Sequence, residues 1–267
     1  MKRNAIARIV IYSVLILLFS GILLTALGID AFTFRTDSGS YEENYTEETF
    51  SVSGISNLDI DWVAGSITIL AADTDVITVS ESGEFSQKYK MRCDVSDNTL
   101  SINYTKSTVF VGIGSHPEKN LLITVPREWF CSELEIDAAA VEVTVDDVQL
   151  RDIELDGAGM VFNILGSFQT LSCDGAGCKL NLTTTYAASQ IELDGAGCKL
   201  QLMLPQNCGF QVQLDGLGCD FSSNISTHRE DGCIVYGDRS CHVDVNGIGC
   251  HIVIQYADAV PAMYFTE

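Results

Sequence analysis

The sequence predicts an all-β fold, a β-solenoid of stacked strand repeats, preceded by one transmembrane helix. Three observations support this fold class. A strand–corner–strand motif recurs about every 20 residues, which is typical of stacked repeat architectures. Apolar side chains alternate with polar ones on both sides of each corner, as in strands with one buried face. An uncharged run over 9–29 is long enough for a membrane-spanning helix.

The motif is clearest at 191–202, which reads IELDGAGCKLQL. Two short alternating segments flank a Gly-Xaa-Gly corner, where glycine permits a sharp change of direction. Further copies lie at 153–164, 171–182, 212–223 and 243–254, with weaker ones at 58–69 and 134–145. Their anchor residues are Asp61, Asp137, Asp156, Asp174, Asp194, Asp215 and Asn246, and from Asp137 to Asp215 the steps are 19, 18, 20 and 21 residues. Such repetition favours a structural unit over a catalytic site.

Stacking the copies places equivalent side chains in ladders. Two inward ladders precede the corner: Ile153, Leu171, Ile191, Val212 and Val243, then Leu155, Cys173, Leu193, Leu214 and Val245. Two follow it: Met160, Cys178, Cys198, Cys219 and Cys250, then Phe162, Leu180, Leu200, Phe221 and Ile252. Volume and apolarity predict that these ladders form the core.

The stacked aspartates admit two interpretations. Each carboxylate can accept backbone N–H bonds from its own corner as an Asx turn, and Asn246 favours this because asparagine makes the same bond without charge. Alternatively, Ca²⁺ binds along the row formed by Asp156, Asp174, Asp194 and Asp215. The nonapeptide spacing of calcium-binding repeats is absent, so we expect no metal site and keep this row as the alternative.

Four of the ten cysteines share one repeat position, where we expect them to act as small hydrophobic side chains. An even number of cysteines outside the cytoplasm also permits disulfides. The candidate pair is Cys233 and Cys241, which flank a turn-like YGDRS stretch. No CxxC spacing indicates a zinc site.

Charge and hydropathy predict the organisation of the chain. Basic residues in 1–8 precede the apolar run, and all 36 acidic residues follow it, so the positive-inside rule places the N-terminus in the cytoplasm. A run of this length favours an uncleaved anchor over a signal peptide. We expect a cytoplasmic segment 1–8, a transmembrane helix 9–29, an acidic stalk 30–50, a repeat domain 51–256, and a tail or final capping strand 257–267.

Composition and motifs exclude several function classes. A net charge of −21 argues against nucleic acid and against direct binding to anionic lipid. The sequence contains no HExxH, GxSxG or P-loop, and its Gly-Ala-Gly corners lie between strands rather than before a helix. We therefore predict no catalytic residues and no cofactor.

The apolar anchor, the acidic stalk and the tandem (I/L)-x-(L/V)-D-G-x-G-x-x-(L/F) copies resemble the bacterial putative-adhesin β-strand-repeat family. That family is related to the toast-rack domains of envelope-stress proteins. The resemblance covers roughly 50–256 and is strongest over 134–254. It implies a right-handed, single-stranded stack on the outer side of a bacterial membrane, and because the family's motif is structural, it transfers no catalytic residue.

The expected function is therefore a membrane-anchored, extracytoplasmic interaction or adhesin-like surface module. Its partner would be a protein or a cell-envelope ligand. The alternative is a regulatory or sensor subunit of an envelope-stress pathway. A carbohydrate-active enzyme ranks third, because it is suggested only by analogy with other solenoids.

Overall fold

The computed structural model describes residues 42–105, 116–184, 188–206 and 208–256. All of them belong to one compact unit, which comprises 40–108 and 116–267. In this described part of the chain, no helix has the length and apolar character needed to cross a bilayer. The predicted anchor 9–29, the segment 1–8 and the tail 257–267 lie outside the described residues.

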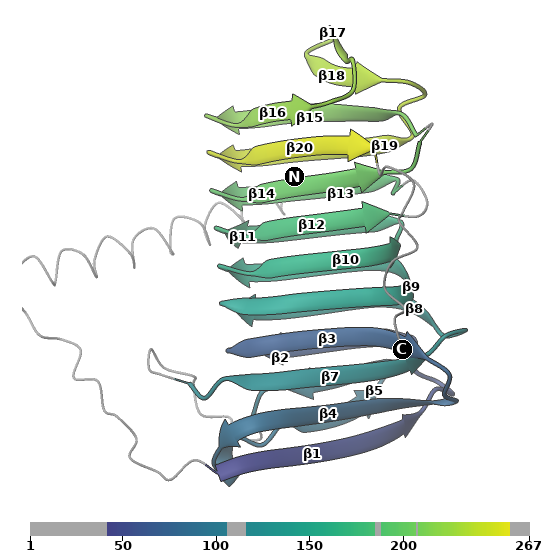
Figure 1. The fold of residues 1–267 in the computed structure, drawn as a ribbon, viewed down its shortest axis with the longest axis vertical. Helices are drawn as coiled ribbons and strands as arrows, with labels where there is room; N and C mark the ends of the chain where they lie inside the picture. Colours follow the sequence, from purple (N-terminus) through teal and green to yellow (C-terminus); the bar gives the residue numbers. More distant parts are fainter. Residues whose placement is uncertain (1–41, 106–115, 185–187, 207, 257–267) are drawn as a thin grey trace, which may run out of the picture. The chain divides into compact units, whose positions relative to one another are not determined.

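The described strands form a single sheet that folds into two faces (Figure 1). The first face contains the strands that precede each corner: β2 (Asn57–Trp62), β5 (Arg92–Ser96), β6 (Thr99–Asn103), β8 (Phe130–Ala139), the second half of β9 (Val141–Ala158), β11 (Thr170–Ala176), β13 (Gln190–Ala196), β15 (Phe210–Leu217), β17 (His228–Glu230), β18 (Cys233–Tyr236) and β19 (Cys241–Ile248). The second face contains β1 (Glu42–Ser51), β3 (Gly65–Ala72), β4 (Val76–Phe85), β7 (Lys119–Pro126), the first half of β9, β10 (Val161–Ser167), β12 (Lys179–Thr184), β14 (Lys199–Leu204), β16 (Asp220–Ser223) and β20 (His251–Tyr256). A short 3₁₀ turn, η1 (Gln87–Tyr89), follows β4.

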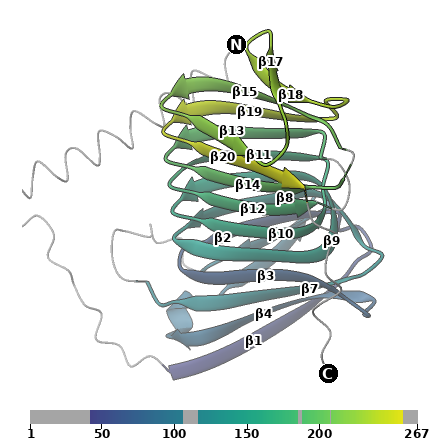
Figure 2. The same ribbon diagram turned by 45° about the horizontal axis from the view of Figure 1, so that its top comes forward.

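One strand from each face makes a coil of the stack, and the coils do not follow chain order. From one end to the other they are β6/β7, β2/β3, β8/β9, β9/β10, β11/β12, β13/β14, β19/β20 and β15/β16. Figure 2 shows β19 between β13 and β15. Simple stacking in chain order would have placed β15/β16 there.

Burial in the last two coils follows their places in the stack. The inner coil, β19/β20, buries Val245, Cys250 and Ile252 completely, whereas Leu214, Cys219 and Phe221 of the terminal coil β15/β16 remain partly exposed, because a terminal repeat has only one neighbour. The β17–β18 hairpin, which pairs with β15, reverses the chain and lets β19/β20 lie between β13/β14 and β15/β16.

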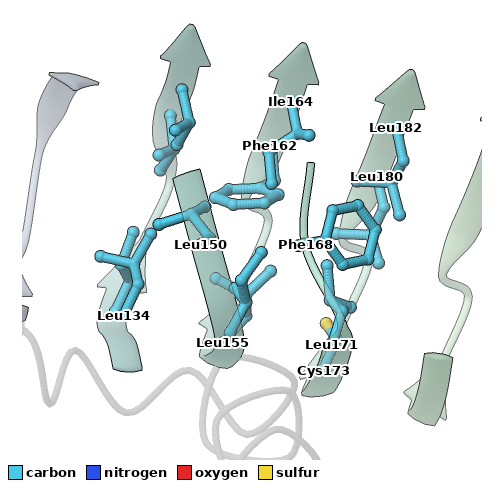
Figure 3. Packing of buried hydrophobic residues seen from close by; sticks show 14 of the residues in the cluster. Leu134, Leu150, Leu155, Phe162, Ile164, Phe168, Leu171, Cys173, Leu180 and Leu182 are labelled. Atoms are coloured by element: carbon cyan, nitrogen blue, oxygen red, sulfur yellow. The ribbon is translucent and has the colours of Figure 1, made fainter. Parts of the chain in front are cut away.

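The core consists of the predicted ladders, in this corrected order. Figure 3 shows the side chains of Leu155 and Cys173 stacked from neighbouring coils, with Phe162 and Leu180 facing them from the other face. The weaker copies are in register as well, since Leu58, Ile60 and Asp61 align with Leu134, Ile136 and Asp137. The period-2 pattern therefore identified the inward positions correctly, although Leu214, Cys219 and Phe221 of the last coil remain partly exposed.

The end of the predicted stalk is part of the fold. Residues 42–51 form β1, which pairs antiparallel with β4 over its whole length. Its exposed side chains include Glu43 and Glu47. Charges on an outermost strand discourage pairing with another chain, so an acidic composition here marks a protected edge rather than a spacer.

Candidate interaction surface

The two glycines of each corner have different roles. Gly159, Gly177, Gly197, Gly218 and Gly249 all adopt φ between +67° and +70°, a conformation that glycine adopts without strain. The first glycine is required by close packing instead: a Cβ on Gly195 would lie 1.9 Å from the carbonyl oxygen of Gly175 in the next coil. In the Gly-Xaa-Gly copies the first glycine therefore serves contact between coils and the second serves the turn, whereas the β8/β9 corner has Ala138 and Ala140 at these two positions.

The cysteine that follows the corner completes the same arrangement. Because the first glycine has no Cβ, the sulfur lies against it, and the Cys198 thiol donates to the Gly175 carbonyl oxygen at 3.5 Å. Cys178, Cys219 and Cys250 make the equivalent bond to Gly157, Gly247 and Gly195. Contact with Cys173 and burial raise the pKa of Cys178 to about 11. A buried thiol with a raised pKa is chemically inert, so these cysteines pack rather than react.

All ten cysteines are free in the structure. The candidate pair Cys233–Cys241 is not bonded. Cys241 on β19 pairs with Phe210, and Phe210 pairs on its other side with Tyr236, which lies at the opposite end of β18 from Cys233. The two cysteines are thus separated by three residues along β18, or about 10 Å, which exceeds disulfide reach.

Alkylation under denaturing conditions should therefore modify ten thiols. The chain would be unfolded in guanidinium with iodoacetamide and no reductant, and its intact mass measured. A reduced and alkylated sample is the control. A mass short by two adducts would reveal one disulfide and contradict the packing role of the cysteines involved.

The aspartates form one continuous row on the first face. In spatial order the row is Asn103, Asp61, Asp137, Asp156, Asp174, Asp194, Asn246 and Asp215. Asn246 separates Asp194 from Asp215, which the chain order did not suggest. An uncharged asparagine therefore bounds the run of five carboxylates at each end, and this limits the repulsion within the row.

Backbone groups, rather than the carboxylates, link the corners. The Gly177 N–H donates to the Ala196 carbonyl at 2.8 Å, and the Gly197 N–H donates to Ile248 at 2.8 Å. Oδ1 of Asp194 is buried and has no hydrogen-bond partner among the described residues. The expected Asx turn is thus absent for this oxygen. Burial, followed by the charges of neighbouring carboxylates, raises the pKa of Asp61, Asp137 and Asp156.

Substitution of Asp156 by asparagine should stabilise the fold at pH 7. Desolvation and then the charge of Asp137 raise the pKa of Asp156 above its ordinary 3.8. Between the ordinary pKa of the unfolded chain and the raised pKa of the folded chain, the folded chain therefore binds more protons. Wild-type stability falls as pH rises through that window. The repulsion is fully present at pH 7. Since solvent screens these outward groups, we expect a gain of about 0.2–1 kcal/mol.

Urea unfolding of wild type and Asp156→Asn at several pH values would measure this effect. The difference should shrink to nothing below the ordinary pKa of 3.8, where both chains are neutral at this position. A destabilised variant at pH 7 would mean that the carboxylate makes a favourable contact. Asp73→Asn, on a side chain far from the row, is the matched control.

Two further outward rows extend the acidic surface. One consists of Ser101, Asp59, Glu135, Glu154, Ser172, Glu192, Asp244 and Gln213, and the other of Thr99, Asn57, Glu133, Asp152, Thr170, Gln190, His242 and Gln211. None of these row positions holds a lysine or an arginine. We call these three rows the acidic face.

The second face has a different charge. Its outward row nearest the corner consists of Asn120, Ser66, Glu142, Val161, Lys179, Lys199, His251 and Asp220. Lysines here oppose the few carboxylates, and His251 lies 2.6 Å from Asp220. In the rows beside the corners, the negative charge is thus concentrated on the first face, whereas on the second face Glu43 and Glu47 lie on the edge strand β1.

The structure brings the calcium candidates onto one surface without forming a cage. Asp156, Asp174 and Asp194 are neighbours in a single line, while Asp215 is separated from them by Asn246. Among the described residues, no group of three or more His, Cys, Asp or Glu side chains converges as a metal site would. Calcium needs six to eight oxygens, more than such a line provides by itself. Calcium binding along this row therefore stays the alternative to the expectation of no metal site.

A buried ion pair was missed by the sequence analysis. Lys119 and Glu81 are both fully buried, and Nζ lies 2.7 Å from Oε2. Nζ also donates to the carbonyl oxygens of Tyr89 and Tyr104, each at 2.6 Å, and Trp62 and Tyr104 present ring faces to it at 4.5 and 4.0 Å. Burial lowers the pKa of Lys119 to about 8, and Glu81 opposes that shift.

Alternation alone could have located this pair. Lys119 occupies the inward phase of KNLLITVP, and Glu81 the inward phase of VITVSESGEF. Lys119 stands in the ladder position that Cys178 and Cys198 occupy in other coils, and Gly65 lies beside it. Its contacts tie η1 and Tyr104 to the stack, so its role is structural.

The family model Toastrack DUF4097 matches residues 55–160 of the chain. No curated protein matches the chain. Among solved structures, a putative cell adhesion protein from Clostridium sporogenes is 11% identical, with a TM-score of 0.48 over 81% of this chain and 100% of that one.

Two further solved structures are similar at lower scores. A putative adhesin from Bacteroides fragilis is 10% identical, and a putative lipid binding protein from Parabacteroides distasonis is 14% identical. For both, the TM-score is 0.36 over 80% of this chain and 97% of the other. Scores this low carry no conclusion about what the chain binds.

Proposed function

We propose, on the premise that residues 55–160 match the family model Toastrack DUF4097, that the chain is a membrane-anchored, extracytoplasmic interaction module without catalytic activity. Its acidic face would dock a partner whose contact surface is basic. The observation that carries the proposal is the charge difference between the outward rows of the two faces from β2/β3 to β15/β16, apart from the acidic edge strand β1 on the second face.

The regular geometry of the acidic face supports binding to an extended surface. Its carboxylates repeat at the strand spacing of about 4.8 Å, so a basic protein surface can meet several of them at once. Their mutual repulsion costs stability, and a cationic partner would relieve it. Asp61, Asp137 and Asp156, whose pKa values are raised, are consecutive in the row of this surface that lies nearest the corner.

The motif residues have packing roles, which supports a module without catalysis. Its glycines pack the corners and its cysteines fill the space beside them. The aspartates recur at every coil, whereas general acid–base chemistry needs one pair in one environment. The anchor 9–29 would hold this surface outside the cell, since basic residues precede it and acidic residues follow it.

Crosslinking in intact cells with a tag after Glu267 tests the proposal. The test chain carries Glu154→Gln and Asp156→Asn, and the matched control carries Glu142→Gln and Asp146→Asn on the second face, so each variant loses two charges. We expect a partner captured by wild type and by the control, and lost from the acidic-face variant and at high salt. Equal capture by both variants would contradict a role for the acidic face.

A further inference from the structure

The corners of the stack form a ridge along which the two faces meet. From coil β8/β9 onward, the middle residues of the corners are, in spatial order, Ala139, Ala158, Ala176, Ala196, Ile248 and Leu217. Among these coils, only the last two replace alanine with a large aliphatic side chain. Leu217 is 76% exposed, its register partner Ile248 is 57% exposed, and the alanine corners show that the turn requires neither. Adjacent large apolar side chains at a projecting point indicate a contact with another molecule.

The ridge lies between rows of opposite charge in coils β11/β12 and β13/β14. Asp174 and Asp194 precede it on the first face, and Lys179 and Lys199 follow it on the second face at the same two levels. Both lysines are exposed, and among the described residues neither forms an ion pair. Each of these two coils therefore presents a carboxylate on one side of the ridge and an ammonium group on the other.

A second copy of the chain fits this pattern. A two-fold axis parallel to the stack, placed outside the corners, sets two ridges against each other with their coils at the same level. The first face of each copy then borders the second face of the other. Asp174 of one copy faces Lys179 of the partner subunit, and Leu217 faces its own equivalent. We propose that the chain forms a parallel dimer through this ridge.

The charges favour this occupant over others. A two-fold axis across the stack would set first face against first face, so that rows of carboxylates would face each other and repel. A uniformly basic protein would attract the aspartates but repel Lys179 and Lys199 on the other side of the ridge. A parallel second copy meets each sign with the opposite one, and opposite charges in facing positions also fix the register of an interface.

Sedimentation equilibrium of the full chain in mild detergent, over a range of concentrations, tests the proposal. We expect wild type to dimerise, and Leu217→Asp to raise the dissociation constant about tenfold or more, because the new charge would lie against its own equivalent. The matched control is Leu165→Asp, on a side chain of β10 that is 45% exposed and lies away from the ridge. It should dimerise as wild type does.

An exchange of charges tests the parallel arrangement. Lys179→Asp should weaken the dimer, because carboxylates would then face each other across the axis. Adding Asp174→Lys should restore it, because each facing position again holds opposite charges. A double variant no stronger than Lys179→Asp would overturn the parallel arrangement.

Two further outcomes would overturn the proposal. One is a monomer at every concentration, and the other is a dimer that Leu217→Asp leaves unchanged, since a different surface would then join the copies. The inference does not rest on the proposed function. Because Leu217→Asp leaves Glu154 and Asp156 in place, the partner capture described above should persist in it, so failure of the dimer is distinguishable from failure of the proposed function.

Discussion

Replacing Lys119 with methionine should lower the free energy of unfolding by about 3–5 kcal/mol, the largest effect expected of a single substitution in this chain. Methionine has similar volume but no charge, so Glu81 would be left buried without its 2.7 Å partner. The carbonyls of Tyr89 and Tyr104 would lose their donor as well. Urea unfolding followed by circular dichroism would measure the change.

The double variant Lys119→Met/Glu81→Met separates charge from packing. Removing both partners of a buried ion pair is often neutral, so the double variant should regain most of the lost stability. A double variant as unstable as the single one would show that the lost contacts to the Tyr89 and Tyr104 carbonyls and to the Met91 N–H, rather than the unpaired carboxylate, dominate. A single variant within about 1 kcal/mol of wild type would contradict the account of this site.

The second large effect is expected at the first glycine of a corner. Gly195→Ala places a Cβ 1.9 Å from the Gly175 carbonyl oxygen. The Cβ is fixed to one backbone and the oxygen belongs to the other, so neither can move without separating the coils. We expect a loss of about 3 kcal/mol or more. Thermal unfolding and urea unfolding would both report it.

Gly197→Ala, two residues away in the same corner, is the matched control. A Cβ there meets nothing within 4 Å, and only the φ of +67° is unfavourable for alanine. The cost should be about 1 kcal/mol. Ala140 occupies the equivalent corner position of β8/β9 with φ +54°, so the fold already accepts this residue once. Equal losses in the two variants would contradict the different roles of the two glycines.

The sequence was sufficient to identify the buried positions. Alternation on both sides of each Gly-Xaa-Gly corner predicted the ladders of Leu155, Cys173 and Leu193, and those side chains are buried. It also predicted that the aspartates align, because in-register stacking follows from the repeat. The acidic face could have been found in the same way, by listing the polar phase of each copy.

The order of the coils could not be predicted. All copies present the same backbone edges, so local pattern does not distinguish a neighbour in the chain from a neighbour in space. The exchange of β15/β16 with β19/β20 goes with a hairpin, β17–β18, that reverses the chain, and one copy of the motif carries no sign of it. The separation of Asp194 from Asp215 by Asn246 follows from that exchange.

The role of each motif residue was likewise decided by contacts between coils. Asp194 was expected to accept backbone N–H bonds from its own corner, but its Oδ1 has no hydrogen-bond partner among the described residues. Backbone hydrogen bonds between coils link the corners. The thiol of Cys198 lies where Gly195 of its own corner lacks a Cβ, and it bonds to Gly175 of the neighbouring coil. A single copy read by itself contains neither contact.

The amino-acid sequence by itself determined the class of fold, the repeat and the inward phase of nearly every strand, because each depends on the local alternation of apolar side chains and on glycine at the corners. Only the tertiary structure decided the order of the coils and the pairing of Lys119 with Glu81 across 38 residues. These features depend on which surfaces come into contact. Residues distant in the chain determine those contacts, because apolar groups must be buried and buried polar groups must find partners.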